Sequence, residues 1–181
     1  EDASIALSFL LSKNSFQAND SLQMLEELNN FRKTLQEDIS QKAQLASDDS
    51  DNAIVVWGED WHEGVIGIVA SKISNKFKRP AFIFSITNGI AKGSARANGE
   101  INLYDLITKA SSLLLGYGGH KNAAGLSLKE ENLEEFKRVI NKQLENKEEF
   151  LHTDPETLGE LDVSSVDLDF LSIIEQFEPY G

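Results

Sequence analysis

The sequence predicts a mixed α/β sheet domain with flanking helices, preceded by a long helix. Apolar runs typical of buried strands alternate with amphipathic helical patterns between residues 53 and 150. Asn88-Gly89 separates two of the strand-like runs and predicts an antiparallel hairpin, so the sheet is expected to be mixed. Upstream, apolar residues recur with helical spacing over residues 19–46, which predicts the long helix.

Length and composition exclude several classes of protein. The chain has 181 residues, 3 Pro, 12 Gly and no Cys, so one or two modest domains are expected, without disulfides or thiolate metal sites. Its longest apolar runs, such as residues 65–70, fall well short of the roughly 20 residues that a membrane-spanning helix needs. The lack of cysteine fits a reducing compartment, and we expect a cytoplasmic protein.

Two helices are expected before the sheet domain. Residues 3–12 predict a short apolar helix, which we interpret as the end of a preceding domain over residues 1–18. With Asn19 or Asp20 as N-cap, a connecting helix is expected within residues 19–50. It is expected to pack on one side only, through a seam formed by Leu25, Leu28, Leu35, Ile39 and Ala46.

The first half of the sheet domain, which is expected over residues 51–150, has clear strand and helix signals. A buried strand, an amphipathic helix and the two strands of the hairpin are expected over residues 53–57, 65–77, 81–86 and 90–95.

The second half returns to a helix and then a strand. Asn102 can cap a helix over residues 103–115, which the glycines at 116–119 are expected to end before a strand at 123–128. Ser127 and Glu130 have the spacing of a capping box, so the last helix is expected to begin there and to end near Phe150. Beyond it, a strand at 157–163 and a helix at 167–177 are expected within a further segment, residues 151–181.

The charge is distributed unevenly along the chain. The net charge is −13, but residues 1–52, 53–129 and 130–181 carry −6, +4 and −11. A locally basic surface can steer an anionic ligand because charges beyond about 10 Å are screened at moderate salt. An excess of four cations is also ordinary for a solvated surface, and charge alone favours this second interpretation.

Two glycine-containing basic segments are candidates for an anion site. In Gly116-Tyr117-Gly118-Gly119-His120-Lys121, glycines can bring backbone N–H groups against a ligand, although a helix C-cap and tight turn explain them equally well. In residues 92–96, Ser94 and Arg96 can offer a hydroxyl and two planar N–H donors to a phosphate, although a lone surface Arg more often pairs with a carboxylate. Together the segments make a shared anion site more plausible than either alone.

Other chemistry has weaker support. Trp61 can stack on a base or cover the core, and His62 beside Glu63 is weak evidence for a metal ligand. The sequence has no P-loop, no recognisable Ser-His-Asp arrangement and no Asp/His cluster for two divalent ions, so the residues alone favour a binding module.

Several blocks of sequence, in their order and spacing, resemble the DHH-associated domain of the RecJ family of exonucleases, which act on single-stranded DNA from 5′ to 3′. These blocks are Trp61-His62-Glu63-Gly64-Val65-Ile66-Gly67-Ile68-Val69-Ala70-Ser71, Arg79-Pro80, Lys92-Gly93-Ser94-Ala95-Arg96 and Gly118-Gly119-His120-Lys121-Asn122-Ala123-Ala124-Gly125. The resemblance extends to the connecting helix and to Phe177-Glu178-Pro179-Tyr180-Gly181, which looks like the start of an OB-fold domain.

The resemblance implies the substrate-binding part of an enzyme that hydrolyses phosphodiester bonds in DNA repair and recombination. It implies Mn²⁺ or Mg²⁺ in the full-length enzyme, held by a catalytic DHH domain of which only the last helix is expected here, so this chain is expected to be inactive alone and to have no metal ligands. It also implies single-stranded DNA as partner, with a single-strand-binding protein or a helicase as further candidates, and a monomer is expected.

The resemblance also assigns the substrate-binding residues. Phosphate contacts are implied for Ser94 and Arg96, and a cleft lining for Gly118, Gly119 and His120; Lys121 and His62 complete the predicted set. Ala97 stands where the family usually has Ser, so one hydroxyl contact is missing. Two alternatives stay open: a phosphodiesterase for short oligonucleotides or cyclic dinucleotides, and a protein-interaction module without catalysis.

Overall fold

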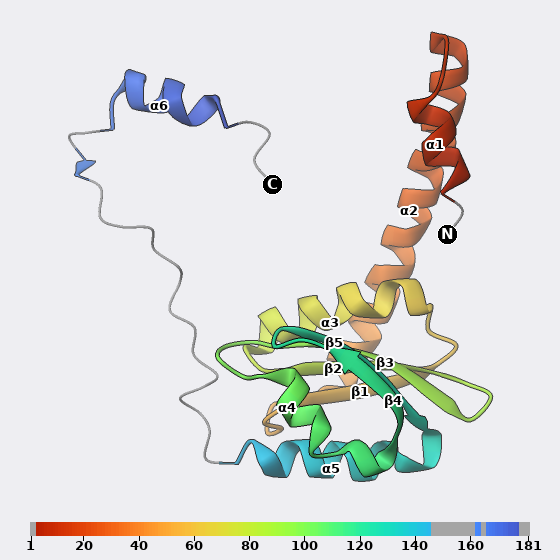
Figure 1. Cartoon of the computed structure of the whole chain (residues 1–181), viewed down its shortest axis with the longest axis vertical. Helices are drawn as coiled ribbons and strands as arrows, with labels where there is room; N and C mark the ends of the chain where they lie inside the picture. Colours follow the sequence, from red (N-terminus) through yellow and green to blue (C-terminus); the bar gives the residue numbers. More distant parts are fainter. Residues whose placement is uncertain (1–2, 146–161, 164–165, 178–181) are drawn as a thin grey trace.

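The computed structural model describes residues 3–145, 162–163 and 166–177. It confirms the predicted mixed α/β sheet: five strands in the order β1-β2-β3-β5-β4, with β1 and β2 parallel and the other pairs antiparallel. Helices lie on both faces of this sheet, and a long helix projects away from it (Figure 1). None of the helices in the described part of the chain is long and apolar enough to cross a membrane.

The long helix α2 (Ser15–Ala46) begins earlier than predicted. Its N-cap is Asn14, whose side chain accepts a hydrogen bond from the N–H of Gln17, so the prediction of Asn19 or Asp20 as cap is wrong. The short helix α1 (Ser4–Leu10) lies alongside its first turns (Figure 1). The predicted apolar seam is also partly wrong, because Leu28 and Ala46 are exposed and only Ile39 of that set is buried.

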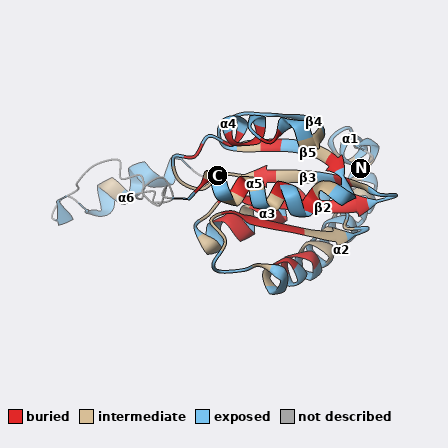
Figure 2. Cartoon of the chain, turned by 90° about the horizontal axis from the view of Figure 1, so that it is seen from below, coloured by how far each residue is buried: buried red, intermediate tan, exposed pale blue. Residues whose placement is uncertain are grey.

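The sheet separates two apolar clusters. On one face, α3 (Glu63–Phe77) and the end of α2 pack on β1 (Ile54–Glu59) and β2 (Ala81–Thr87). On the other face, α4 (Leu103–Thr108) and α5 (Leu133–Gln143) cover β2, β3 (Ile90–Arg96) and β5 (Ala123–Lys129). Figure 2 shows the buried residues concentrated between these layers.

The segment after α4 differs from the sequence prediction. The predicted helix over residues 103–115 ends at Thr108, and a 3₁₀ turn (Ser111–Leu113) leads into an unpredicted edge strand, β4 (Leu114–Gly119). The glycines at 116–119 therefore do not end a helix; they pair with β5 in the sheet. Burial of Leu103, Leu106 and Ile107 fixes the helix to the sheet for two turns, after which the chain turns to extend the sheet.

The last helices confirm part of the predictions. The predicted capping box is wrong: Ser127 lies in β5, and the helix α5 follows a 3₁₀ turn (Glu130–Asn132) with Asn132 as N-cap. Asn141 of α5 fixes this helix to the start of β1, because its side chain exchanges hydrogen bonds of 2.9 and 3.1 Å with the backbone of Ala53.

The predicted helix end near Phe150 and most of the predicted strand 157–163 lie outside the described residues, whereas α6 (Leu168–Glu175) confirms the predicted last helix.

The hairpin of β2 and β3 is confirmed and is closely packed. Asn88 and Gly89 have φ of 52° and 73°, which suits a two-residue turn between twisted strands. Gly93 lies directly opposite Phe84, and a Cβ at this position would overlap the Phe84 ring. Phe84 is fully buried and packs edge-on against Phe136 of α5, with 5.7 Å between ring centroids, so it cannot move away.

We predict that Gly93→Ala destabilises the fold by about 1–3 kcal/mol because it overpacks this contact. Gly125→Ala on the neighbouring strand is the matched control, since a Cβ there meets nothing within 4 Å. It should change the free energy of unfolding, measured by urea denaturation, by less than about 0.5 kcal/mol. Equal effects of the two substitutions would contradict the role given to the Phe84 contact.

Candidate functional site

A groove lies beside α3, on the face of the sheet that this helix covers in part. The helix packs on β2 and β3, and β5 and β4 extend the sheet beyond it. The groove measures about 630 Å³ and is lined by the first half of α3 and by residues of β3, β5 and β4. Residues of both predicted basic segments line it.

Strand register brings the small and basic residues of three strands into rows across this face. Side chains alternate between the faces of a strand, so every second residue of β3 points toward the groove. Two complete rows and a partial third run across β3, β5 and β4: Lys92, Ser127 and Gly116; Ser94, Gly125 and Gly118; Arg96 and Ala123. Ser94, Arg96 and Gly118, which the sequence analysis selected, therefore lie on one surface.

The floor of the groove is made largely of backbone. A Cβ added to Gly118 or Gly125 would meet nothing within 4 Å, and one added to Gly116 would meet only the Ser127 hydroxyl, at 3.7 Å. The space above the strands is therefore open because these positions lack side chains. A ligand can approach the peptide groups of β5 and β4 directly.

Arg96 is held at the wall of the groove, and some of its N–H donors have no partner among the described residues. One terminal nitrogen donates to the Ser94 hydroxyl at 3.0 Å and to the Ala95 carbonyl at 2.8 Å. Gly67 lets α3 pass closely, since a Cβ there would lie 3.2 Å from the other terminal nitrogen of Arg96 and 3.1 Å from the Ser94 hydroxyl oxygen. Arg96 forms no ion pair with any residue that the structure describes, so its remaining N–H groups can bind an anion.

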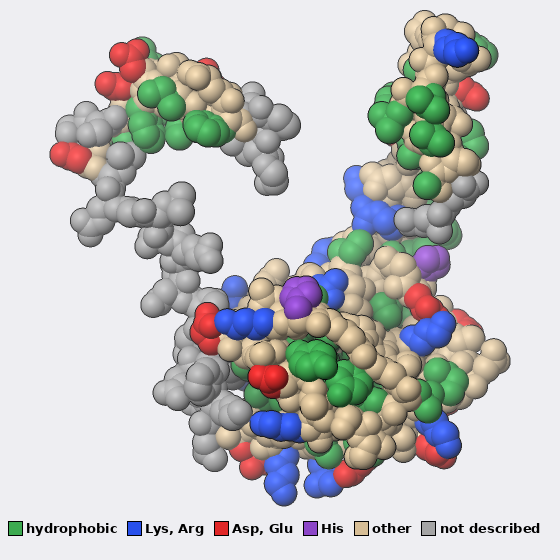
Figure 3. Space-filling model, in the orientation of Figure 1, with side chains coloured by type: hydrophobic (Ala, Val, Ile, Leu, Met, Phe, Trp, Pro, Cys, Tyr) green, Lys and Arg blue, Asp and Glu red, His purple; other side chains and the backbone are tan. Residues whose placement is uncertain are grey.

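Four of the eight other cations in residues 53–129 are paired with carboxylates. The ion pairs are Lys72–Glu37, Lys92–Glu63, Lys121–Glu100 and Lys129–Glu131, and all eight side chains are well exposed. Figure 3 shows basic and acidic side chains next to one another around the sheet domain instead of a single basic patch. The local excess of positive charge therefore acts at a few positions, of which Arg96 faces the groove.

The turn between β4 and β5 carries the glycine-histidine residues. Gly119 has a φ of 151°, and a Cβ on it would lie too close to the backbone of Ala123 and Ala124, so this position requires glycine. The backbone N–H of His120 donates to the Ala123 carbonyl at 2.9 Å, and its Nδ1 accepts from the N–H of Asn122 at 3.3 Å. Lys121 pairs with Glu100 at 2.5 Å.

This turn is fixed to the segment that follows Arg96. The N–H groups of Ala97 and Leu103 donate to the carbonyls of Asn122 and Lys121, at 3.0 and 2.9 Å. Ala97 thus holds the turn through its backbone. Gly119, His120 and Lys121 do not line the groove, but they continue the surface beyond its Arg96 end.

His62 and Trp61 have structural positions. His62 is the N-cap of α3, and its Nδ1 accepts a hydrogen bond of 3.1 Å from the N–H of Gly64. It is not among the residues that line the groove. Trp61 lies over Gly58 and packs against the α3 cluster, which confirms its interpretation as a cover over the core.

Within the described ranges, no three His, Asp or Glu side chains come together as a group that could hold a metal ion.

The sequence analysis missed part of the groove. Gly67, Gly125 and Ser127 line it without having been selected as site residues, and Gly116 and Lys92 were named only as members of the two basic segments, without a role of their own. A twofold alternation in residues 123–128 could have revealed Gly125 and Ser127, because Ala124, Leu126 and Leu128 are the apolar members. A role for Gly116 could not be found in this way, because residues 116–119 were predicted to break a helix and not to form a strand.

Comparisons with known proteins agree with this architecture. The DHHA1 domain family matches residues 50–146. The single-stranded-DNA-specific exonuclease RecJ of Bacillus subtilis is 32% identical over 191 residues, covering 100% of this chain and 24% of that protein. RecJ of Thermus thermophilus is 37% identical over 139 residues, covering 77% of this chain and 20% of that protein. The chain thus spans about a quarter or less of these relatives.

Solved structures give the same result. RecJ from Thermus thermophilus in complex with Mn²⁺ has a TM-score of 0.80 at 32% identity and covers 99% of this chain and 27% of that chain. Another structure, of exonuclease RecJ bound to manganese, has a TM-score of 0.73 at 34% identity and covers 80% of this chain and 37% of that chain. The chain therefore belongs to the DHHA1 domain family, and its similarity to the RecJ single-stranded-DNA-specific exonucleases extends over its whole length.

Proposed function

We propose that this chain is the substrate-holding part of a 5′→3′ exonuclease that acts on single-stranded DNA in repair and recombination. The observation that carries the proposal is the groove beside α3, which combines Arg96, without a carboxylate partner among the described residues, with a floor of glycine backbone. The printed activity of the RecJ relatives gives the substrate class.

The groove suits the sugar-phosphate backbone of a single strand. Arg96 can offer two parallel N–H donors to a phosphate, and Ser94 adds a hydroxyl at the same position. Gly125 and Gly118 leave the neighbouring floor open, so a nucleotide can lie flat against the strands. Such contacts fix the position of a strand without reading its sequence, as an exonuclease requires.

The remaining predicted residues extend this interface. We assign Gly118, Gly119 and His120, with Lys121, to the end of the substrate nearest the bond that is cut. Gly118 lies in the row of Ser94 and Gly125, and the other three residues continue the surface past Arg96. His62, at the start of α3, is assigned a contact at the other end, although its ring already caps the helix.

Hydrolysis itself is assigned to another part of the enzyme. We propose that Mn²⁺ or Mg²⁺ serves the full-length enzyme and is held by residues outside the described part of this chain, as the metal-bound RecJ structures suggest. The chain alone is then hydrolytically inert, and degradation of a labelled single-stranded oligonucleotide by it in Mn²⁺ would contradict this assignment.

Arg96→Gln should weaken binding of a fluorescently labelled single-stranded oligonucleotide at least about tenfold because a charge-assisted contact is lost. One phosphate contact fewer should also reduce the slope of log K against log salt concentration by about 0.7. Arg138→Gln on α5 is the charge-matched control, since Arg138 lies on the opposite side of the sheet and pairs with Glu135. The proposal fails if the control weakens binding as much as Arg96→Gln.

Side chains introduced on the floor of the groove should block the binding of single-stranded DNA without unfolding the domain. We expect Gly125→Ala to lower the affinity for a single-stranded oligonucleotide and Gly125→Val to lower it further, because each larger side chain occupies more of the space above β5. Urea denaturation should show free energies of unfolding within about 0.5 kcal/mol of the unsubstituted chain, as is usual for exposed positions. Undiminished affinity of Gly125→Val would place the nucleic acid elsewhere.

A further inference from the structure

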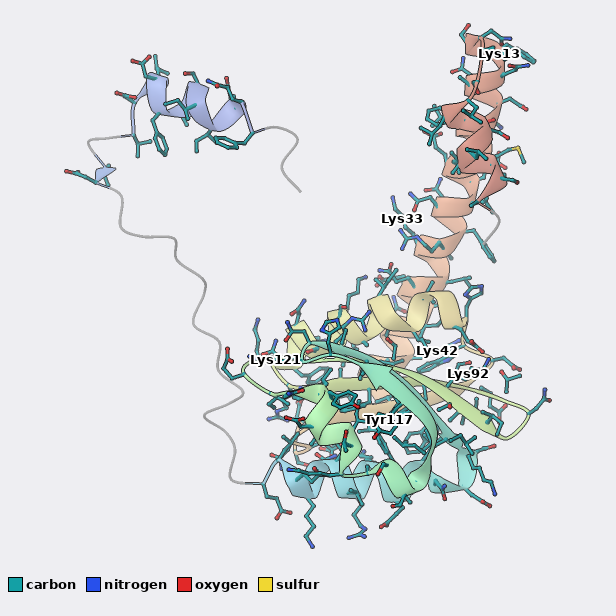
Figure 4. The ribbon with its side chains drawn as sticks, viewed as in Figure 1. Lys13, Lys33, Lys42, Lys92, Tyr117 and Lys121 are labelled. Carbon is teal, nitrogen blue, oxygen red and sulfur yellow. The ribbon has the colours of Figure 1, made fainter. Side chains whose placement is uncertain are left out.

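We propose that Lys92 is a second phosphate-binding position in the groove, and that the Glu63 carboxylate occupies this position while no nucleic acid is bound. The proposal rests on the function proposed above and adds to it a residue and a means of regulating affinity. It concerns the end of the groove opposite the turn between β4 and β5. Figure 4 shows Lys92 and Lys121 at opposite ends of the sheet.

Lys92 shares the groove face of β3 with Ser94 and Arg96. Two residues of a strand span about 6.8 Å, so Lys92 and Arg96 lie about 13–14 Å apart along β3. A single strand that follows β3 and places one phosphate on Arg96 therefore brings a later phosphate to Lys92. Ser127, opposite Lys92 on β5, and Gly116 beyond it keep this part of the floor low and polar.

In the free protein, the Glu63 carboxylate forms an ion pair with Lys92. Glu63 is the first residue of α3, and its two carboxylate oxygens lie 3.0 and 3.3 Å from Lys92 Nζ. Both residues line the groove, so the ion pair lies where a phosphate would enter. Arg96, on the same strand, has no carboxylate partner in the described structure. In the free protein Lys92 is therefore ion-paired, whereas Arg96 is not.

An exchange of carboxylate for phosphate is physically reasonable here. The side chains of Lys92 and Glu63 are 59% and 53% exposed, and exposed ion pairs stabilise a fold only slightly. The position of α3 does not depend on the pair, because Val65, Ile66 and Val69 are buried against the sheet. Displacing Glu63 therefore leaves the fold intact, but it reduces the net gain from a phosphate at Lys92.

A double-mutant cycle on oligonucleotide binding tests the proposal. Lys92→Gln should weaken binding of a labelled single strand about fivefold and reduce the salt slope by about 0.7. Glu63→Gln should strengthen binding about threefold because the phosphate no longer competes with a carboxylate. In the Lys92→Gln background, Glu63→Gln should have little effect, since the cation that the carboxylate blocks is gone.

The pair Glu135→Gln and Arg138→Gln on α5 gives the matched control for charge, and it should leave affinity unchanged. Thermal unfolding of each variant checks that the fold is retained. The inference is overturned if Lys92→Gln binds like the unsubstituted chain while Arg96→Gln does not. It is also overturned if Glu63→Gln strengthens binding equally with and without Lys92, because Glu63 then acts only by general repulsion. Failure of the unsubstituted chain to bind any single strand would instead overturn the proposed function itself.

Discussion

The two faces of β3 must meet opposite requirements, and the rest of the structure depends on this constraint. Toward α5, the strand carries only Ala91, Gly93 and Ala95, because the rings of Phe84 and Phe136 fill the space above it. Toward the groove, the intervening positions carry Lys92, Ser94 and Arg96. Tight packing on one face thus holds the strand in place, and the polar residues project from its other face at fixed spacing.

Much of this arrangement could be predicted from the sequence, since local signals specified it. The Asn88-Gly89 turn predicted the hairpin, and the twofold alternation of a strand then puts Ser94 and Arg96 on the same face of β3. The edge strand β4 could not be predicted, because Leu114 and Leu115 also continue the apolar pattern of the preceding helix and glycines usually end one. Its strand state comes from pairing with β5, a tertiary contact that no local pattern encodes.

The net charge of a segment likewise does not show which of its cations are free to bind a ligand. The sum over residues 53–129 indicates a basic segment, yet partners from α2, α3 and neighbouring loops neutralise most of its lysines. Only the fold decides which cations stay available: Arg96 donates to the Ser94 hydroxyl and the Ala95 carbonyl and has no ion-pair partner among the described residues. In the function that we propose, a few oriented donors over a backbone floor, more than net charge, provide weak, sequence-independent binding.

The central claim is that a single strand of DNA lies in the groove beside α3, and backbone amide NMR shifts measured during titration with a short oligonucleotide test it most directly. The account predicts that the shifted amides cluster in β3, β5, β4 and the first half of α3, with Gly67, Arg96, Gly118 and Gly125 among them. Amides of α5, on the opposite side of the sheet, should stay unchanged. Shifts centred on α5 or on the exposed half of α2, with none in the groove, would contradict the account.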